Sequence, residues 1–185
     1  KEADDEIVPA TAAQTACDAA MTLPQFIYQS NRDIFLGGKW GLDVIIPVVA
    51  LDLDYGTSLS AFPQDNGSGL GDILIGPYLQ WDPIMGKNGP IFMHRIEFQM
   101  IFPTGEYSQN KELNPGSNFF SFNPYWAGTL FISPKLTAST RIHYLWNRRN
   151  NEPGRKYRAM GAHDTQAGQS VHANFTMAYE IIEKR

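Results

Sequence analysis

The chain has little cysteine, no excess of basic residues and no long apolar run. Its single cysteine, Cys17, rules out a disulfide bond within the chain. The formal net charge at pH 7 is −4 over 185 residues, which argues against a nucleic-acid partner. A transmembrane helix needs about 18 or more consecutive apolar residues, and the sequence contains no such run. Any function must therefore be sought in shorter patterns within a chain of about one domain's length.

The most regular pattern is an alternation of apolar and polar residues at period two, clearest in residues 91–102. Ile96, Phe98, Met100 and Phe102 fall on one face, and Arg95, Glu97 and Gln99 fall on the other. Side chains alternate between the two faces of a β-strand, so this segment has one apolar and one polar surface. A soluble β-sandwich buries the apolar face, whereas a transmembrane barrel turns it toward lipid and lines its lumen with the polar face.

The lengths of the segments and of their connections favour the barrel. Seven extended segments are predicted, at residues 22–30, 39–54, 70–82, 91–103, 119–132, 136–149 and 169–182. The connections between them alternate between short and long, as do the periplasmic turns and extracellular loops of outer-membrane barrels. Most segments also reach the roughly 9 to 11 residues of a spanning strand. Aromatic residues, at 12% of the chain, gather near segment ends as in the girdles of such barrels.

Residues 1–21 differ from the rest of the chain. They begin with an acidic stretch, continue with small residues and lack an apolar stripe that could face lipid. We predict a separate N-terminal segment here, outside the strands, that occupies the lumen or its mouth as a plug. Residues 22–185 are predicted to form the transmembrane strands and loops. The chain starts without methionine or an apolar targeting segment, so any signal peptide is expected to have been removed or to lie outside it.

An ordered set of motifs makes the sequence resemble a known family. The motifs are DVIIPVVALD (43–52), GLGDILIGPYLQW (69–81), FPTGEY (102–107), NPGSN (114–118) and FNP (122–124). In this order they resemble the "meta-pathway of phenol degradation" family of outer-membrane proteins. The resemblance implies an all-β fold, an antiparallel up-and-down barrel of about a dozen strands. It also implies a channel for hydrophobic, often aromatic, growth substrates. Seven segments are fewer than such members carry.

The polar faces of the segments are predicted to line the lumen. Charges in a narrow lumen are costly unless they are paired or hydrated, and Arg95 and Glu97 are neighbours on one face. Asp72 and Arg141 are candidate cross-strand partners. Two roles stay open for these charges: salt bridges that hold the barrel closed, and selectivity. The predicted lumen-lining residues are Asp72, Tyr78, Arg95, Glu97, Gln99, Asn123, Tyr125, Arg141, His143, His172 and Asn174.

Three prolines, Pro47, Pro77 and Pro124, lie in the middle of predicted strands. Proline cannot donate a hydrogen bond to a strand ladder, so central strands normally exclude it. Two interpretations remain open. The prolines mark bulges that shape the wall, or they mark a lateral opening through which a hydrophobic solute leaves the lumen for the bilayer.

Catalytic and metal-binding interpretations are weaker. His143 with Ser139 and His172 with Ser170 suggest a hydrolase, but each pair lies on one inward face and no aspartate is evident to orient the histidine. The histidines lack metal-ligand spacing, and the glycines of 67–71 do not match a nucleotide-binding fingerprint. We therefore expect that the protein is not an enzyme and that it holds no metal or cofactor.

Two alternatives to a channel remain: a barrel-borne lipid hydrolase, and a structural or adhesive barrel without transport.

The expected function is passive uptake of small hydrophobic, aromatic molecules across the bacterial outer membrane. Expected partners are these solutes, outer-membrane lipid and lipopolysaccharide. The long connection at 150–168 and its flank are basic, and they either meet lipopolysaccharide phosphates or are simply solvated. These basic residues are Arg148, Arg149, Arg155, Lys156 and Arg158. The sequence leaves the oligomeric state open, with a monomer favoured.

Overall fold

The computed structural model describes residues 16–54, 67–111 and 113–181, and these are almost entirely β-strand. The strands are β1 (Ala16–Thr22), β2 (Gln25–Phe35), β3 (Gly38–Ile45), β4 (Val48–Asp54), β5 (Gly69–Leu70), β6 (Ile73–Trp81), β7 (Ile84–Gly86), β8 (Gly89–Phe102), β9 (Ser121–Ser133), β10 (Leu136–Asn147) and β11 (Ser170–Tyr179). One short helix, α1 (Arg155–Ala159), lies in the last long loop. Within these ranges, no helix has the length and apolarity that crossing a membrane would require.

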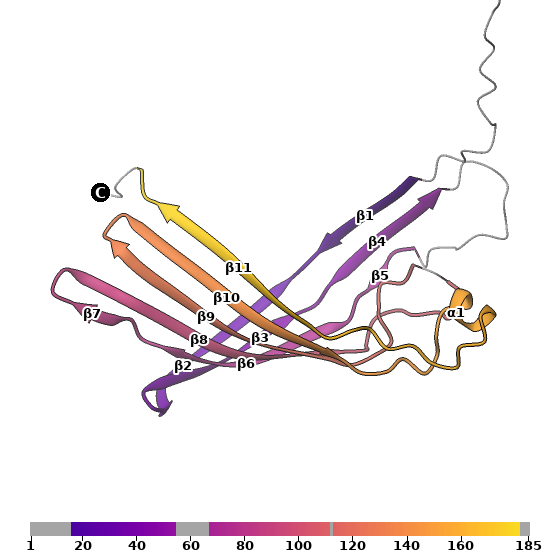
Figure 1. The fold of residues 1–185 in the computed structure, drawn as a ribbon, viewed down its shortest axis with the longest axis horizontal. Coiled ribbons are helices and arrows are strands. Elements are labelled where there is room, and N and C mark those ends of the chain that lie inside the picture. Colours follow the sequence, from indigo (N-terminus) through magenta and orange to yellow (C-terminus); the bar gives the residue numbers. More distant parts are fainter. Residues whose placement is uncertain (1–15, 55–66, 112, 182–185) are drawn as a thin grey trace, which may run out of the picture.

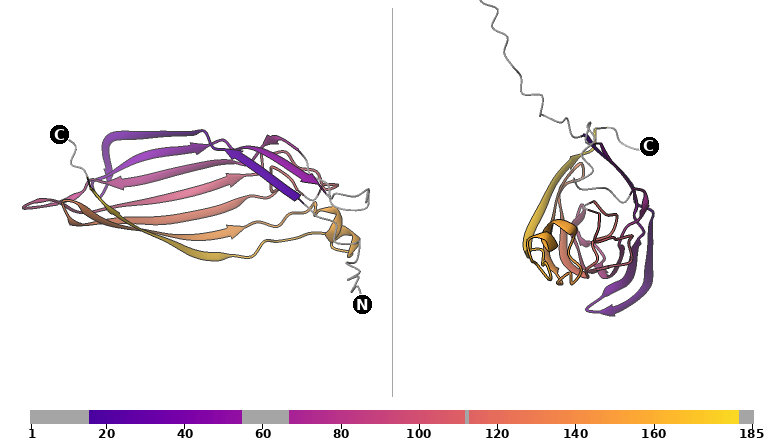
Figure 2. Two further views of the ribbon diagram at one scale, coloured as in Figure 1. Left: turned by 90° about the horizontal axis from the view of Figure 1, so that it is seen from above. Right: turned by 90° about the vertical axis from the view of Figure 1, so that its right-hand side faces the viewer.

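The strands form an antiparallel, up-and-down sheet that curls around an interior (Figures 1 and 2). It is divided into two hydrogen-bonded parts, one with the strand order β11-β10-β9-β8-β6-β3-β2 and one with the order β1-β4-β5, and β7 pairs only with β8. The seven predicted segments correspond, in order, to β2, β3 with β4, β5 with β6, then β8, β9, β10 and β11. The predicted all-β, up-and-down architecture is confirmed. The sheet is not closed within the described ranges, where β2 and β11 do not pair with each other.

Short turns gather at one end of the sheet, while α1 and the long loops after β8 and β10 lie at the other (Figure 1). A two-residue turn joins β2 to β3 through Leu36 and Gly37, whose φ angles are +50° and +77°. Two consecutive residues at positive φ give the two-residue turn whose twist matches antiparallel strands. The hairpin of β7 falls in the predicted short connection at 83–90, and the sequence pattern missed it.

A line of interruptions crosses three neighbouring segments and divides the wall into two sheets. The residues outside the ladder are 23–24, 46–47 and 71–72. Single hydrogen bonds bridge the line, from the Ile46 amide to the Pro24 carbonyl (3.0 Å) and from the Gly71 amide to the Pro47 carbonyl (2.8 Å). Because prolines lack the amide hydrogen, Pro24 and Pro47 cannot continue the ladder at these positions.

Pro77 and Pro124 interrupt the ladder on one side only. Pro77 pairs with Leu42 of β3, but the pairs between β6 and β8 pass from Ile75–Met100 directly to Tyr78–Glu97. Pro124 similarly pairs with Phe98 of β8, while the β9–β10 pairs pass from Tyr125–His143 to Phe122–Trp146. Each proline therefore leaves a short unpaired stretch at the middle of the wall, on the side where its missing amide hydrogen would have been needed.

The predicted boundary at residue 21 is wrong in one respect. Residues 16–22 form β1, which pairs with β4 from Ala16–Asp54 to Thr22–Val48. The end of the predicted N-terminal segment thus belongs to the strand ladder. The sequence pattern missed β1 because its small side chains show no alternation, and its pairing with β4 is a long-range contact. Residues 1–15 lie outside the described residues, so a plug formed by them stays a prediction.

The distribution of buried residues in this sheet is the reverse of that in a soluble protein. Among the described residues, the buried set is mostly polar, and its apolar members are Tyr78 and Tyr125. Large apolar side chains are exposed, with Phe98 at 45% and Phe175 at 80% of their accessible surface. The buried polar residues are Ser30, Asp43, Glu97, Gln99, Ser121, His143, Asn147 and Asn150. The inner face of the curl is therefore polar and the outer face apolar.

The first turn of the loop after β8 is held against β6 by Asp72. Its carboxylate accepts hydrogen bonds from the amides of Gly105 (2.9 Å) and Ser117 (2.8 Å) and from the Ser117 hydroxyl. Gly71, Gly105 and Gly116 pack backbone to backbone beside it. A Cβ atom built on Gly105 would lie 2.7 Å from both the Gly116 Cα and the Gly71 carbonyl carbon.

We predict that Gly105→Ala lowers the free energy of unfolding by about 1–3 kcal/mol, because backbone atoms must move to admit the methyl group. The measurement is the urea midpoint of the refolded protein in detergent. Gly168→Ala is the matched control, since a Cβ there meets no atom within 4 Å. Equal midpoints for both variants would show that the three glycines are not in close contact.

Candidate functional site

One row of polar and aromatic side chains crosses the inner face of the sheet on β6, β8, β9, β10 and β11. Its members are direct cross-strand neighbours: Tyr78 with Glu97, Glu97 with Tyr125, Tyr125 with His143, and His143 with His172. We call these five residues the polar belt. The belt runs perpendicular to the strands, across the inner face of the sheet.

Glu97 is the centre of the belt and is fully buried, with 0% of its surface exposed. Both carboxylate oxygens are hydrogen-bonded. The Tyr125 hydroxyl donates to Oε2, and the Gln99 side-chain amide donates to Oε1 at 2.9 Å. A guanidinium nitrogen of Arg95 lies 3.5 Å from Oε2. These contacts supply the partners that a buried carboxylate requires.

Two glycines on neighbouring strands make room for the belt. A Cβ atom on Gly76 would lie 2.5 Å from Oε1 of Glu97, so the carboxylate lies against the bare backbone of β6. A Cβ on Gly41 would lie 2.1 Å from Cζ of Tyr78. The Tyr78 ring crosses β3 at that glycine, and its hydroxyl donates to the carbonyl of Tyr28 on β2 (3.1 Å).

The belt is extended by a network of amide and guanidinium groups. Nε of Arg95 donates to the Gln80 side-chain oxygen (2.9 Å), and the Arg95 guanidinium lies 3.9 Å from the centre of the Tyr78 ring. On the other side of Glu97, the Asn123 amide donates to the Gln99 side-chain oxygen (2.9 Å). Hydrogen bonds thus join side chains of β6, β8 and β9 into one unit.

The part of the belt on β10 and β11 is held by ring stacking. The His143 and His172 rings are stacked at 4.5 Å between centroids, with an interplanar angle of 9°. The His143 ring also contacts Tyr125 at 4.9 Å, and the Arg141 guanidinium lies 4.7 Å from the centre of the Tyr125 ring. His143 Nδ1 is buried and has no hydrogen-bond partner within the described part of the chain.

The structure brings together most of the predicted lumen residues on the inner face but gives Asp72 a different neighbourhood. Asp72 accepts hydrogen bonds from the loop after β8, as described above, and no ion pair joins it to Arg95 or Arg141 among the described residues. Arg95 pairs with Glu97 instead.

Two polar residues of the inner face, Gln80 and Asp43, were not predicted from the sequence. Asp43 is 4% exposed and accepts a hydrogen bond from Gln25 (2.7 Å). The period-two pattern of β3 would have found it.

Among the described residues, no hydrogen bond joins Ser139 to His143 or Ser170 to His172. The hydroxyl of Ser139 lies within hydrogen-bonding distance of the Thr129 hydroxyl (3.0 Å), while His143 stacks on His172. No group of three or more His, Cys, Asp and Glu side chains suited to a metal ion occurs in the ranges that the structure covers.

The two long loops after β8 and β10 are joined at the loop end of the sheet. Asn150 is the hub: its side-chain oxygen accepts from the Asn118 amide (3.0 Å), and its amide donates to the Tyr107 hydroxyl (3.3 Å). Two of the basic loop residues are used within the loops. Arg149 forms an ion pair with Asp164 (3.0 Å), and Arg158 donates to the carbonyl of Gln109 and the side chain of Asn110.

Comparison with known proteins identifies the fold. The crystal structure of an outer membrane channel from Pseudomonas putida F1 is similar to this chain, with a TM-score of 0.69 and 15% sequence identity. The likeness covers 90% of this chain and 57% of that one, so this chain spans a little over half the length of the channel. The fold is thus that of an outer-membrane β-barrel channel.

Comparison with curated protein sequences finds no match. The family model described as "Putative MetA-pathway of phenol degradation" matches residues 3–185, which is nearly the whole chain and agrees with the resemblance noted from its motifs. The chain belongs to this family.

Proposed function

We propose that this protein is an outer-membrane channel for the passive uptake of small hydrophobic, aromatic molecules. One observation carries the proposal: the sheet has a polar, buried inner face and an apolar, exposed outer face. Such a distribution is stable when lipid covers the outside, because exposed apolar area on this scale is unfavourable in water. The family and the channel fold support the same conclusion.

The position of the outer aromatic residues supports a location in the bacterial outer membrane. At the loop end, Phe102 contacts Phe120 (5.5 Å between ring centroids) and Phe120 contacts Trp146 (6.5 Å). Nearer the short turns, Phe92 contacts Trp126 (6.4 Å). Aromatic side chains near both ends of the outer face correspond to the two interfacial girdles of an outer-membrane barrel. In this orientation, the basic loop residues would meet lipopolysaccharide phosphates.

The inner face would then be the lumen, lined by the polar belt and the residues beside it. A solute entering from the loop end would pass Gln99 and Asn123, then the rings of Tyr78, Tyr125 and His143. Amides and rings bind small aromatic molecules weakly, which suits passive flow because a solute must also leave. The proposal includes no catalytic step, cofactor or metal.

We also propose that the prolines of the wall mark a lateral exit from the lumen to the bilayer. Next to Pro77 and Pro124 the ladder skips two pairs on one side, and Pro47 lies on the line that separates the two sheets. Backbone groups that lack a ladder partner cannot face hydrocarbon cheaply. These stretches are therefore the weakest points of the wall, where a hydrophobic solute would leave for the bilayer.

The channel function is tested by uptake in whole cells, where lipopolysaccharide is the barrier to hydrophobic solutes. A strain without the protein is compared with the same strain carrying the full-length natural protein, at low concentrations of a labelled small aromatic compound. We expect uptake to be severalfold faster with the protein. Equal rates would instead favour a structural barrel without transport.

The outer face should not tolerate charge. We predict that Phe98→Arg lowers the stability of the barrel in lipid by about 2–4 kcal/mol if the residue lies near the membrane midplane. The measurement is equilibrium unfolding in lipid vesicles, with Phe98→Leu as a matched control that keeps the site apolar. A loss in Phe98→Arg no larger than that in Phe98→Leu would place this face away from hydrocarbon.

The lateral exit makes a separate prediction. Replacing Pro47 and Pro77 by valine restores the missing amide hydrogens, so the ladder should close and uptake of a hydrophobic solute should fall severalfold. Ion conductance through the lumen, measured in planar bilayers, should change much less. Pro134→Val, in the β9–β10 turn, is the control. Unchanged uptake in the double variant would leave the prolines as residues that only shape the wall.

A further inference from the structure

We propose that Arg141 and its neighbours form a binding subsite for the carboxylate of small aromatic acids. The inference rests on the proposed channel function and names a solute class for it. The subsite lies on the inner face of β9, β10 and β11, one step toward the short turns from the polar belt. There Arg141 pairs directly with Asn174, as His143 pairs with His172 in the belt.

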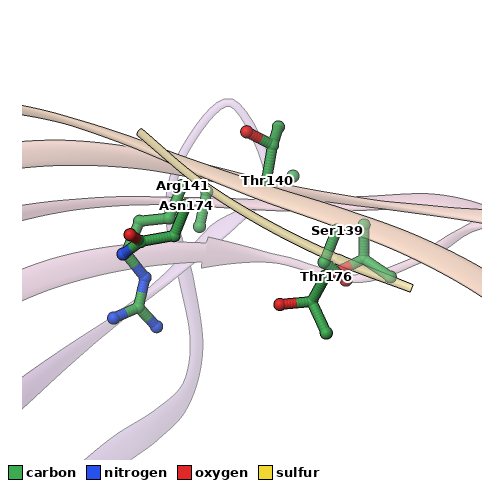
Figure 3. Close-up of a pocket in the computed structure, with 8 residues that line it drawn as sticks. Ser139, Thr140, Arg141, Asn174 and Thr176 are labelled. Carbon is green, nitrogen blue, oxygen red and sulfur yellow. The ribbon is translucent and has the colours of Figure 1, made fainter. Parts of the chain in front are cut away.

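The site is a pocket of about 370 Å³, within the usual range for small-molecule sites. Figure 3 shows Arg141, Asn174, Ser139 and Thr176 on the same side of the strands, while Thr140 points to the opposite side. Thr129 completes the polar lining, and its hydroxyl lies 3.0 Å from that of Ser139. The pocket thus gathers one guanidinium, one amide and three hydroxyl groups.

The charge of Arg141 is not neutralised by a carboxylate. Arg95 lies beside Glu97 and Arg149 beside Asp164, but Arg141 has no ion pair with any residue that the structure describes. No acidic side chain lines the pocket. A cation that faces only neutral hydrogen-bonding groups at membrane depth is unfavourable unless water or an anion meets it. The planar guanidinium, with two parallel N–H donors, matches a carboxylate better than it matches a spherical ion.

The rings beside Arg141 favour an aromatic anion over other carboxylates. Tyr125 lies under the guanidinium, and the stacked rings of His143 and His172 continue from it along the belt. An aromatic acid bound to Arg141 through its carboxylate would have ring faces within reach for its own ring. His143, whose Nδ1 is buried and unpartnered within the described residues, lies two residues from Arg141 along β10.

The test compares two probes of nearly equal shape, benzoate and neutral benzamide, in the full-length protein. Uptake of both is measured for the parent, for Arg141→Gln and for Arg141→Lys. Loss of a charge-assisted contact is expected to slow benzoate uptake by about tenfold in Arg141→Gln. Benzamide uptake should stay within about twofold, and Arg141→Lys should recover part of the benzoate uptake because the charge remains. Arg149→Gln, which removes an ion-paired loop arginine, is the matched control and should alter neither probe.

Three results would overturn the inference. Benzoate uptake that is unchanged in Arg141→Gln, although the parent transports both probes, would refute the subsite and leave the channel function standing. A chloride conductance that falls as strongly as benzoate uptake would show a general anion site without aromatic preference. Failure of the parent to transport either probe would refute the channel function itself. Heat-dependent mobility in gel electrophoresis shows whether each variant is a folded barrel, so misfolding is scored separately.

Discussion

The buried carboxylate of Glu97 is the constraint on which the rest of the sheet depends. With no exposed surface, it needs the Tyr125 hydroxyl, the Gln99 amide and the Arg95 guanidinium at once. Leaving such a group unpaired would be strongly destabilising. A slip of one residue between β8 and β9 would turn Tyr125 to the outer face and remove its bond, so polar pairing on the inside fixes the register. Gly76 follows from the same constraint, because any larger residue would displace the carboxylate.

The inner and outer faces of this sheet contribute to its structure differently from the core and surface of a soluble domain. There, close packing of apolar side chains selects one structure, and the surface tolerates change. Here the outer residues need only be apolar, since lipid adapts to their shape, and the selective contacts are the hydrogen bonds of the inner face. The aromatic pairs of the outer face, such as Phe98 with Phe122, add contact area without setting the register.

Period-two alternation and loop length were enough to predict the up-and-down sheet and its two chemically different faces, because both are local properties of the chain. The positions of Gly41 and Gly76 under Tyr78 and Glu97 were not predictable, since they depend on which strands become neighbours. The same holds for β1, whose small residues are strand only because β4 lies beside them, and for the interruption at Pro24. Asp72 was predicted as a lumen charge. It holds a loop because Gly105 and Ser117, far from it in sequence, present their amides to it.

The two roles that the sequence left open for the inner charges, closure and selectivity, belong to different strands in this interpretation. On β8, Arg95 and Glu97 form an ion pair, and the side-chain amide groups of Gln80 and Gln99 bind them. These contacts stabilise the pairing of β8 with its neighbours. On β10 and β11, Arg141 meets only rings, hydroxyls and an amide among the described residues. A charge whose partners are already in place cannot gain much from a solute, whereas one without a counter-charge can. The proposed selectivity therefore belongs to β10 and β11, where the charge of Arg141 is not paired with a carboxylate among the described residues.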